Sequence, residues 1–266
     1  WNQLRDILHS WPSDVYVIPG NHDQYAGLRN CLEGLHGGPV TVVTKPISTE
    51  LGVMIPYHPA SEFPKVLRKA VQQQTEHDPA VVFCHQGFRN AYMNAMRRDR
   101  HGVALSDVST DYLVVTGHYH MPQSVGRVVY CGSPYETSFA EEGQKKGYLR
   151  WTWGDSWPQR LPFALSAPTH HTVRWTDPNQ PPEVPAGLRP QDRVRVLSNF
   201  TRDQTAELTK RHKVPLQGLA VQCRPDTAAG RAGTVHEPDE ALDDYLSRTH
   251  PEAYHALGEF AAQHGV

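Results

Sequence analysis

Short apolar runs, each ended by glycine, proline or a polar residue, recur through the first part of the chain. Residues 15–18, 80–84 and 112–116 are such runs, and their lengths are typical of buried strands. Between them, residues 61–77 place apolar side chains on one face of a helix. Buried strands that alternate with helices predict a layered α/β domain.

Weaker patterns of the same kind surround these runs. Helical spacing occurs near the start of the chain, and strand-like segments cluster as hairpins toward residue 150. Both patterns fit a sheet that is covered by helices. The additional elements that we expect are helices over 1–11 and 24–35, a pair of strands over 40–43 and 51–55, and strands over 125–130 and 147–153.

The character of the sequence changes after residue 157. Residues 177–190 are rich in proline and are expected to be extended. Strand patterns at 192–197 and 219–223 flank a helical pattern at 202–212, a unit too small to be the main fold. We expect three parts: an α/β domain over 1–163, a small α+β domain over 164–230, and a helical tail over 231–266 with helices near 240–247 and 251–263.

Composition narrows the class of protein. Lys and Arg number 26 against 28 Asp and Glu, a formal charge of −2, which excludes a globally basic nucleic-acid binder but leaves room for a local basic patch. No apolar run reaches the roughly 18 residues that a membrane span needs, and the start does not resemble a signal peptide. The four cysteines form no CxxC pair, which favours reduced thiols in a cytoplasmic protein over a cysteine zinc site.

Polar residues that can bind metals follow three of the predicted buried strands. In α/β sheets, ligands bind beyond the carboxyl ends of the strands, so side chains placed there are expected to converge. Imidazole nitrogens together with an amide oxygen suit Mn, Fe, Zn or Ni better than Mg or Ca. The three groups are Asn21-His22-Asp23, then His85, and then His118-Tyr119-His120.

Each group alone has an ordinary explanation. The chain has 16 histidines, and a single His85 at a strand end is more often a hydrogen-bonded core residue than a ligand. Asn21 and Asp23 could simply form an Asx-turn, because both residue types favour that role. Turn chemistry does not readily explain all three groups at strand ends in this order.

The combination resembles a known family. GNHD at Gly20–Asp23, the strand-end His85 and GHYH at Gly117–His120 resemble the last three motif blocks of the calcineurin-like metallophosphoesterase superfamily, over roughly residues 1–150. The resemblance implies a layered sandwich of two mixed β-sheets flanked by helices, and two divalent metal ions held side by side. The expected metal is Mn²⁺, with Fe, Zn and Ni as alternatives.

The resemblance also implies a role for each motif residue. Asn21, His85 and His118 would coordinate one metal, and His120 would coordinate the other. His22 would be a catalytic histidine that binds no metal and protonates the leaving oxygen. Asp23 would orient His22 or its loop.

The segment after the last motif is similar to a narrower group. Residues 130–139, YCGSPYETSF, and 145–148, KKGY, look like the Gly-Ser-Pro loop and Lys-Gly strand of the SbcD-type double-strand-break-repair exonucleases. That similarity implies a DNA exo/endonuclease with a capping domain, and C-terminal helices that dock on a coiled-coil SMC-like ATPase. The tail helices could equally pack on the chain's own body, and the chain could form a homodimer.

Two basic clusters lie near the predicted metal-bearing loops. Arg97 and Arg98 follow the His85 loop, and Lys145 and Lys146 follow the Gly-Ser-Pro loop. Either cluster could contact the phosphates of a DNA backbone. The ordinary alternative is a solvated surface with no ligand.

The superfamily has two earlier blocks, an Asp-x-His and a Gly-Asp-x-x-Asp whose aspartate bridges the metals. Asp6 and Asp14 are the only acidic residues before Asn21, and neither fits these blocks. We therefore expect an N-terminally truncated member of the superfamily. Without the bridging carboxylate, repulsion between two cations is uncompensated, so we expect at most one weakly bound metal and poor activity.

Three functions fit these observations. The first is a metal-dependent phosphodiesterase that acts on DNA in repair or recombination. The second is a metallophosphoesterase for small phosphoesters or phosphoproteins. The third is an inactive scaffold that binds DNA or an ATPase, although such a scaffold has no need for His22.

Overall fold

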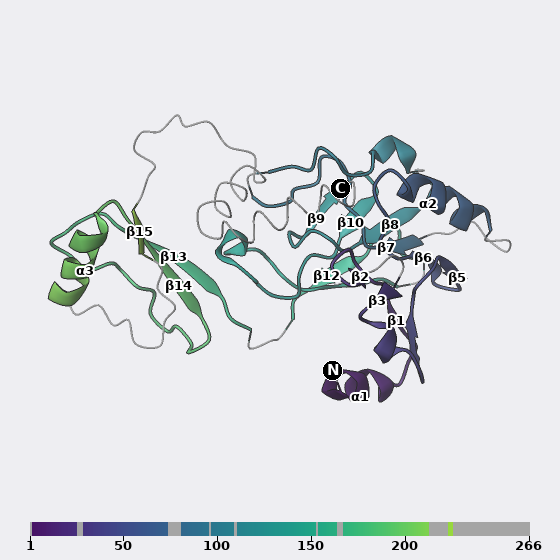
Figure 1. Ribbon diagram of the computed structural model, residues 1–266, viewed down its shortest axis with the longest axis horizontal. Coiled ribbons are helices and arrows are strands. Elements are labelled where there is room, and N and C mark those ends of the chain that lie inside the picture. Colours follow the sequence, from purple (N-terminus) through teal and green to yellow (C-terminus); the bar gives the residue numbers. More distant parts are fainter. Residues whose placement is uncertain are drawn as a thin grey trace, which may run out of the picture. The chain divides into compact units, whose positions relative to one another are not determined.

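The chain has an α/β fold with mixed sheets and few helices (Figure 1). The computed structural model describes residues 2–25, 29–73, 81–95, 97–108, 111–152, 154–163, 167–212 and 223–225. Nearly all of them belong to one compact unit that ends at Arg224. The tail helices expected within 231–266 lie outside the described residues.

The main sheet has six strands in the order β5-β6-β7-β8-β10-β9. Its four inner strands are parallel, and the two edge strands pair antiparallel with their neighbours. The strands are β5 (Ile47–Thr49), β6 (Gly52–Ile55), β7 (Val81–Cys84), β8 (Leu113–Thr116), β9 (Gln123–Val125) and β10 (Val128–Tyr130). The predicted strands over 80–84 and 112–116 are therefore confirmed.

Both faces of the main sheet are covered. One face packs against helix α2 (Phe63–Gln72), which buries Phe63 and Leu67 completely. On the other face, Leu113 and Val129 pack near the partly buried Trp151. Burial on both faces explains why these strands are almost continuously apolar in sequence. Burying a side chain of this size completely, instead of leaving it exposed to water, stabilises the fold by about 1.5–3 kcal/mol.

Helix α2 confirms part of the helix predicted over 61–77. It begins at Phe63 with a proline at the next position, where the missing N–H costs no hydrogen bond. Phe63 meets Phe88 edge to face, with 6.0 Å between the ring centroids. The helix ends at Gln72, and residues 74–80 lie outside the described residues.

The strand pairing expected for 40–43 is wrong. Strand β4 (Val40–Val42) pairs in parallel with β1 (Val15–Val17), in a separate two-stranded sheet. Strand β6 pairs instead with β5, because a tight turn joins the two antiparallel strands. Strand β1 is half-buried rather than buried. The expectation that β1 lies in one sheet with β7 and β8 is therefore also wrong.

The helix predicted over 24–35 is wrong as well. The segment instead contains the short antiparallel strands β2 (Gln24–Tyr25) and β3 (Arg29–Asn30), followed by the 3-10 turn η1 (Glu33–Leu35). Local hydrogen bonds compete with the helix: Cys31 N–H donates to Asp23 O at 2.9 Å, and Leu32 N–H donates to the Asn30 side chain at 3.0 Å.

Helix α1 (Asn2–His9) confirms most of the first predicted helix. It has no buried residue, and its apolar side chains Leu4 and Ile7 are exposed. Trp11, just beyond the helix, is 56% exposed. None of the helices in the described part of the chain combines the length and apolar character needed to cross a bilayer.

The strand predicted over 147–153 forms a small hairpin. Strands β11 (Tyr148–Arg150) and β12 (Gln159–Leu161) pair antiparallel. The guanidinium of Arg160 donates to Tyr130 O at 2.8 Å and to Cys131 O at 2.7 Å, which fastens the hairpin to the end of β10. Cys31, Cys84 and Cys131 are free thiols, and burial raises the pKa of Cys84 to about 12.

The region after residue 167 confirms the strand predicted over 192–197 and the helix predicted over 202–212, and it contains one further strand. Of the strand predicted over 219–223, only Cys223 belongs to the described residues, as the first residue of a strand over 223–225. Strand β13 (His170–Trp175), which the sequence analysis missed, pairs in parallel with β14 (Arg193–Ser198). Helix α3 (Arg202–Arg211) follows, with a capping box between Thr201 and Gln204, and β15 (Cys223–Pro225) completes the three-stranded sheet. Trp175, Val196 and Leu208 form its small core.

The segment 136–142 contacts both β13 and the loop that follows β8. It contains the 3-10 turn η3 (Phe139–Glu141). Glu136 accepts a hydrogen bond from His170 N–H at 2.7 Å, and Glu142 accepts one from Thr172 N–H at 2.8 Å. The third glutamate of the segment, Glu141, contacts the main domain and is described below.

Candidate metal centre

Strands β7 and β8 bring His85 and His118 to the same edge of the main sheet. Cys84 pairs with Thr116 in the parallel register, so the residues after both strands emerge together. Gly117 N–H donates to Cys84 O at 3.2 Å, which keeps the two loops adjacent. The imidazole rings of His85 and His118 meet edge to face, with 5.3 Å between centroids.

Asn21 lies at the same edge, although the strand before it, β1, belongs to a different sheet from β7 and β8. Tyr57, which follows β6, donates its N–H to Pro19 O at 3.0 Å and accepts a hydrogen bond from the Gln24 side chain. These two bonds hold the loop after β1 against the carboxyl end of the main sheet. As a result Asn21 Oδ1 lies 3.2 Å from His118 Nδ1, across 97 positions of the sequence.

Two glycines make room for His85. A Cβ atom on Gly20 would lie 2.7 Å from Cε1 of His85, and one on Gly117 would lie 2.9 Å from its Nδ1. Contacts this short are not tolerated, so both glycines of the GNHD and GHYH motifs are needed for the close approach of the two loops. The imidazole of His85 is held between them.

The imidazoles of His85 and His118 are neutral at neutral pH. Burial, together with the neighbouring His118, lowers the pKa of His85 to about 4. Burial also lowers the pKa of His118. His22, Asp23 and His120 lie close enough to act on the charge of His85. A neutral imidazole has the lone pair that metal binding requires.

His118 adopts a strained backbone conformation, with φ of 76°. The residue after it is firmly anchored: the hydroxyl of Tyr119 donates to Asp99 at 2.6 Å, and its ring stacks on Tyr130 at 5.3 Å. Burial, together with the Asp99 carboxylate, raises the pKa of Tyr119. This anchor opposes relaxation of the strained turn and so fixes the direction of the His118 side chain.

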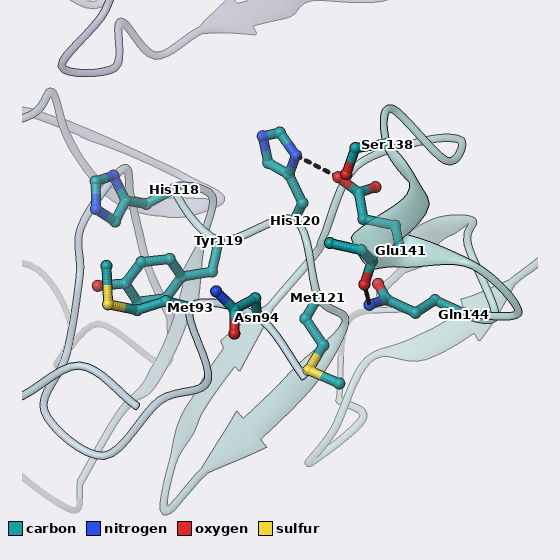
Figure 2. Close-up of a pocket in the computed structure, with 10 residues that line it drawn as sticks. Met93, Asn94, His118, Tyr119, His120, Met121, Ser138, Glu141 and Gln144 are labelled. Carbon is teal, nitrogen blue, oxygen red and sulfur yellow. Dashed lines mark hydrogen bonds and ion pairs between the residues drawn. The ribbon is translucent and has the colours of Figure 1, made fainter. Parts of the chain in front are cut away.

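His120 lies on the same loop but contacts a different set of residues. Its Nδ1 is 2.8 Å from Oε1 of Glu141 (Figure 2). The same nitrogen is 3.2 Å from the hydroxyl of Thr137. Burial disfavours ionisation of Glu141, but hydrogen bonds from Lys146, Thr137 and His120 outweigh it and lower its pKa to about 2. The sequence analysis noted the surrounding segment but missed Glu141.

Asp23 fixes its own loop. Its carboxylate accepts a hydrogen bond from Gly20 N–H at 2.8 Å, and its own N–H donates to Gly20 O at 3.2 Å. Of the two roles expected for Asp23, the structure supports the one directed at the loop. His22, between Asn21 and Asp23, is exposed.

Asn21 and His118 fit a divalent cation in chemistry and spacing, and His85 places a further imidazole beside them. Two atoms that bind one cation at about 2.1 Å each, at an angle of about 90–110°, lie about 3.0–3.4 Å apart. The 3.2 Å between Asn21 Oδ1 and His118 Nδ1 falls in that range. Within the described residues, no group of three or more His, Cys, Asp and Glu side chains has the arrangement of a metal site, and the amide of Asn21 is outside those residue types.

No protein-family model matches the chain, and no curated protein matches it. The chemistry of the site is therefore inferred from its own side chains.

A pocket of about 280 Å³ opens beside His118 and His120 (Figure 2). Met93, Asn94 and Met121 line it together with the two histidines. This volume is slightly below the roughly 300–1,000 Å³ of pockets that enclose small ligands.

The Arg97–Arg98 cluster is tied to this pocket through its backbone. Arg97 O accepts a hydrogen bond from Met93 N–H at 2.8 Å, and Arg97 N–H donates to the Asn94 side chain at 2.9 Å. The guanidinium of Arg98 donates to the hydroxyl of Tyr92 at 2.7 Å and lies 4.0 Å above its ring centroid. Both arginines are exposed.

The two lysines expected to contact phosphate differ in position. Lys145 is exposed. The side chain of Lys146 is only 7% exposed, and its ammonium donates to His120 O at 2.7 Å, to Ser133 Oγ at 2.8 Å and to Glu141 at 2.7 Å. An ammonium has three protons. The expected phosphate contact of Lys146 would therefore require breaking this network.

Proposed function

We propose that the chain is a metal-dependent phosphodiesterase, and that its substrate is DNA, cleaved in an exo- or endonucleolytic manner during repair or recombination. The observation that supports this most directly is the approach of Asn21 Oδ1 to His118 Nδ1 at 3.2 Å, beside the buried His85. This contact is a hydrogen bond as the chain stands. What favours a shared ligand is that groups with metal-binding lone pairs come to one sheet edge from three separate loops.

Asn21, His85 and His118 would hold one divalent cation. His120 would contribute to a second only if further ligands balanced its charge, so this chain by itself is expected to bind at most one cation, weakly. Mn²⁺ suits this donor set, and Fe, Zn and Ni are the alternatives. When bound, such cations generate a nucleophile from water and stabilise the charge that develops on the phosphoryl oxygens.

The chain's own residues supply the remaining chemistry. As the phosphorus–oxygen bond to the sugar breaks, the departing oxygen needs a proton. The exposed imidazole of His22 is the proposed donor, because it is adjacent to Asn21 and an imidazole can carry and release a proton. Asp23 keeps His22 in place indirectly, through the hydrogen bonds that close its loop on Gly20.

The basic side chains favour a polyanionic substrate. Arg97, Arg98 and Lys145 are exposed, and the backbone of Arg97 is bonded to residues that line the pocket beside His118 and His120. Contacts of this kind neutralise phosphates without reading sequence. A long DNA backbone is therefore a better match than a small phosphoester enclosed in a pocket.

The test combines metal binding with cleavage. Calorimetric titration of the chain with Mn²⁺, and incubation with end-labelled duplex DNA in Mn²⁺, should show binding and cleavage. Both should be lost in the double variant His85→Asn/His118→Asn and kept in His171→Asn, whose imidazole contacts Thr169 in the small domain. Mn²⁺ binding that is equal in the double variant would overturn the proposal. Hydrolysis of bis(4-nitrophenyl) phosphate without cleavage of DNA would leave the phosphodiesterase and remove the DNA substrate.

A further inference from the structure

Glu141 is the centre of a buried network beside His120. One carboxylate oxygen, Oε1, lies 2.8 Å from Nδ1 of His120 and accepts a hydrogen bond from the Thr137 hydroxyl at 2.5 Å. The other, Oε2, accepts hydrogen bonds from Ser133 Oγ at 3.0 Å and Thr137 N–H at 3.1 Å, and is 2.7 Å from the ammonium of Lys146. Every other contact of the carboxylate is with a donor, and the role of His120 Nδ1 depends on its tautomer.

Lys146 holds both partners of the His120–Glu141 contact. Its ammonium is 2.7 Å from the Glu141 carboxylate and donates to the backbone oxygen of His120 at 2.7 Å. The side chains of Lys146 and Glu141 are 7% and 8% exposed, so this is not a surface ion pair of negligible effect. A buried pair is well placed when additional hydrogen bonds satisfy both charged groups, and here they do.

The imidazole of His120 needs such support. Its side chain is 57% exposed, so packing alone does not fix the ring. A carboxylate can only accept hydrogen bonds, so its contact with Nδ1 requires a proton on Nδ1; in the neutral ring the lone pair is then on Nε2. A carboxylate on the far nitrogen is also the usual way in which a metal-binding histidine is oriented.

We propose that Glu141, held by Lys146, is the positioning residue of His120: it fixes the ring and the Nδ1–H tautomer, so that Nε2 is the atom offered to a cation. The assignment of Nε2 to a cation rests on the proposed function above, whereas the fixed tautomer does not. A purely structural role, in which Glu141 only closes the loop over 133–146, would leave the tautomer of His120 unchanged when the carboxylate is removed.

Nuclear magnetic resonance of the metal-free chain tests the tautomer directly. Histidine labelled with ¹⁵N gives distinct nitrogen shifts for protonated and unprotonated ring nitrogens, and the His120 signals are identified by their loss in His120→Asn. The spectrum should show His120 with its proton on Nδ1. In Glu141→Gln, whose amide can donate as well as accept, His120 should become a mixture of both tautomers.

Glu142→Gln is the matched control. It removes the same charge one position away, from a carboxylate that contacts Thr172 instead of His120. It should leave the His120 signals as they are in the unaltered chain. An Nε2–H tautomer in the unaltered chain, or an unchanged Nδ1–H tautomer in Glu141→Gln, would overturn the proposal. If Glu141→Gln fails to fold, the tautomer of the unaltered chain still decides.

A Zn²⁺ titration followed on the His120 signals tests the role of Nε2. Zn²⁺ is the probe because nitrogen sites bind it more tightly than Mn²⁺. Loss of a carboxylate partner typically weakens metal binding 10–100-fold, so half-saturation of the His120 shift should need about tenfold or more Zn²⁺ in Glu141→Gln. Equal half-saturation would overturn this role. Failure of Asn21, His85 and His118 to bind metal would instead count against the proposed function and would leave the tautomer result standing.

Discussion

A Cβ atom on Gly20 would lie 2.7 Å from Cε1 of His85, so the loop that carries Asn21 can approach this imidazole only because residue 20 has no side chain. Gly20→Ala should therefore push the loop away from the sheet edge. We expect Mn²⁺ affinity, measured by calorimetry, to fall at least tenfold. Gly34→Ala is the control, because a Cβ there meets nothing within 4 Å. Equal losses in both variants would show that the close contact has no functional effect.

The hydrogen bond from Tyr119 to Asp99 anchors the strained turn at His118, so removing it should destabilise the folded chain. Tyr119→Phe removes the hydroxyl that donates to Asp99 at 2.6 Å and leaves a buried carboxylate oxygen without this partner. The free energy of unfolding in urea should fall by about 1–3 kcal/mol. Tyr135→Phe, at an exposed tyrosine, should change it by less than about 0.5 kcal/mol. A Tyr119→Phe variant as stable as the parent would contradict this anchoring role.

The ion pair between Asp192 and Arg189, next to the start of β14, should make stability depend on pH. The guanidinium of Arg189, 2.8 Å away, lowers the pKa of Asp192 below its ordinary value, and burial opposes this only in part. A lowered pKa stabilises the folded state above the unfolded value of about 3.9, and the stabilisation is lost as pH falls through the folded pKa. The stability gap between the parent and Asp192→Asn should be full at pH 7 and shrink below about pH 4.

Thermal melts of both chains from pH 7 to pH 2.5 measure that gap. Asp155→Asn, at an exposed aspartate, is the control and should show no pH-dependent gap. A constant difference between Asp192→Asn and the parent across the whole range would mean that the ion pair contributes nothing that depends on pH.

The exposed arginines predict the salt dependence of DNA binding. Arg97→Glu/Arg98→Glu should weaken binding to duplexes of any sequence and reduce the slope of log K against log salt by about one for each lost phosphate contact. Fluorescence anisotropy at several salt concentrations measures the slope. Arg68→Glu/Lys69→Glu makes the same charge change on α2 and should have a smaller effect. Identical slopes in both double variants would remove the phosphate assignment.

Because the metal-binding side chains are uncharged, we expect the chain to bind few metal ions. Asn21, His85 and His118 carry no negative charge, while the carboxylates of Asp23 and Glu141 are bonded to Gly20 and Lys146. Nothing among these groups offsets the repulsion between two cations. Calorimetry should therefore show at most one Mn²⁺ per chain, bound weakly. Two tight sites would contradict this account.

The sequence predicted which side chains lie together better than it predicted the strand pairing that brings them there. The short apolar runs before His85 and His118 were enough to place both residues at one sheet edge, because consecutive parallel strands in a buried sheet are nearly all apolar. The position of Asn21 was correct for the wrong reason. Its strand lies in another sheet, and hydrogen bonds to Tyr57 bring its loop across.

The wrong predictions share one physical cause: they depend on side-chain contacts that the spacing of apolar and polar residues does not reveal. Residues 24–35 have helical spacing, but Asp23 and Asn30 supply hydrogen bonds that favour turns. The sequence pattern predicts that Lys146 is a surface cation, but its ion pair with Glu141 and its hydrogen bond to Ser133 hold the side chain in a buried position. Glu141 itself meets His120 across 21 positions, through a turn that no periodicity predicts.

The three glutamates at 136, 141 and 142 connect two parts of the molecule. Glu136 and Glu142 bond to strand β13, and Glu141 bonds to the imidazole of His120. A stretch this short cannot shift at one end and stay still at the other. A bound polymer or an amino-acid replacement that displaces β13 should therefore also displace Glu141. The hydrogen bond between Glu141 and His120 would change as a result.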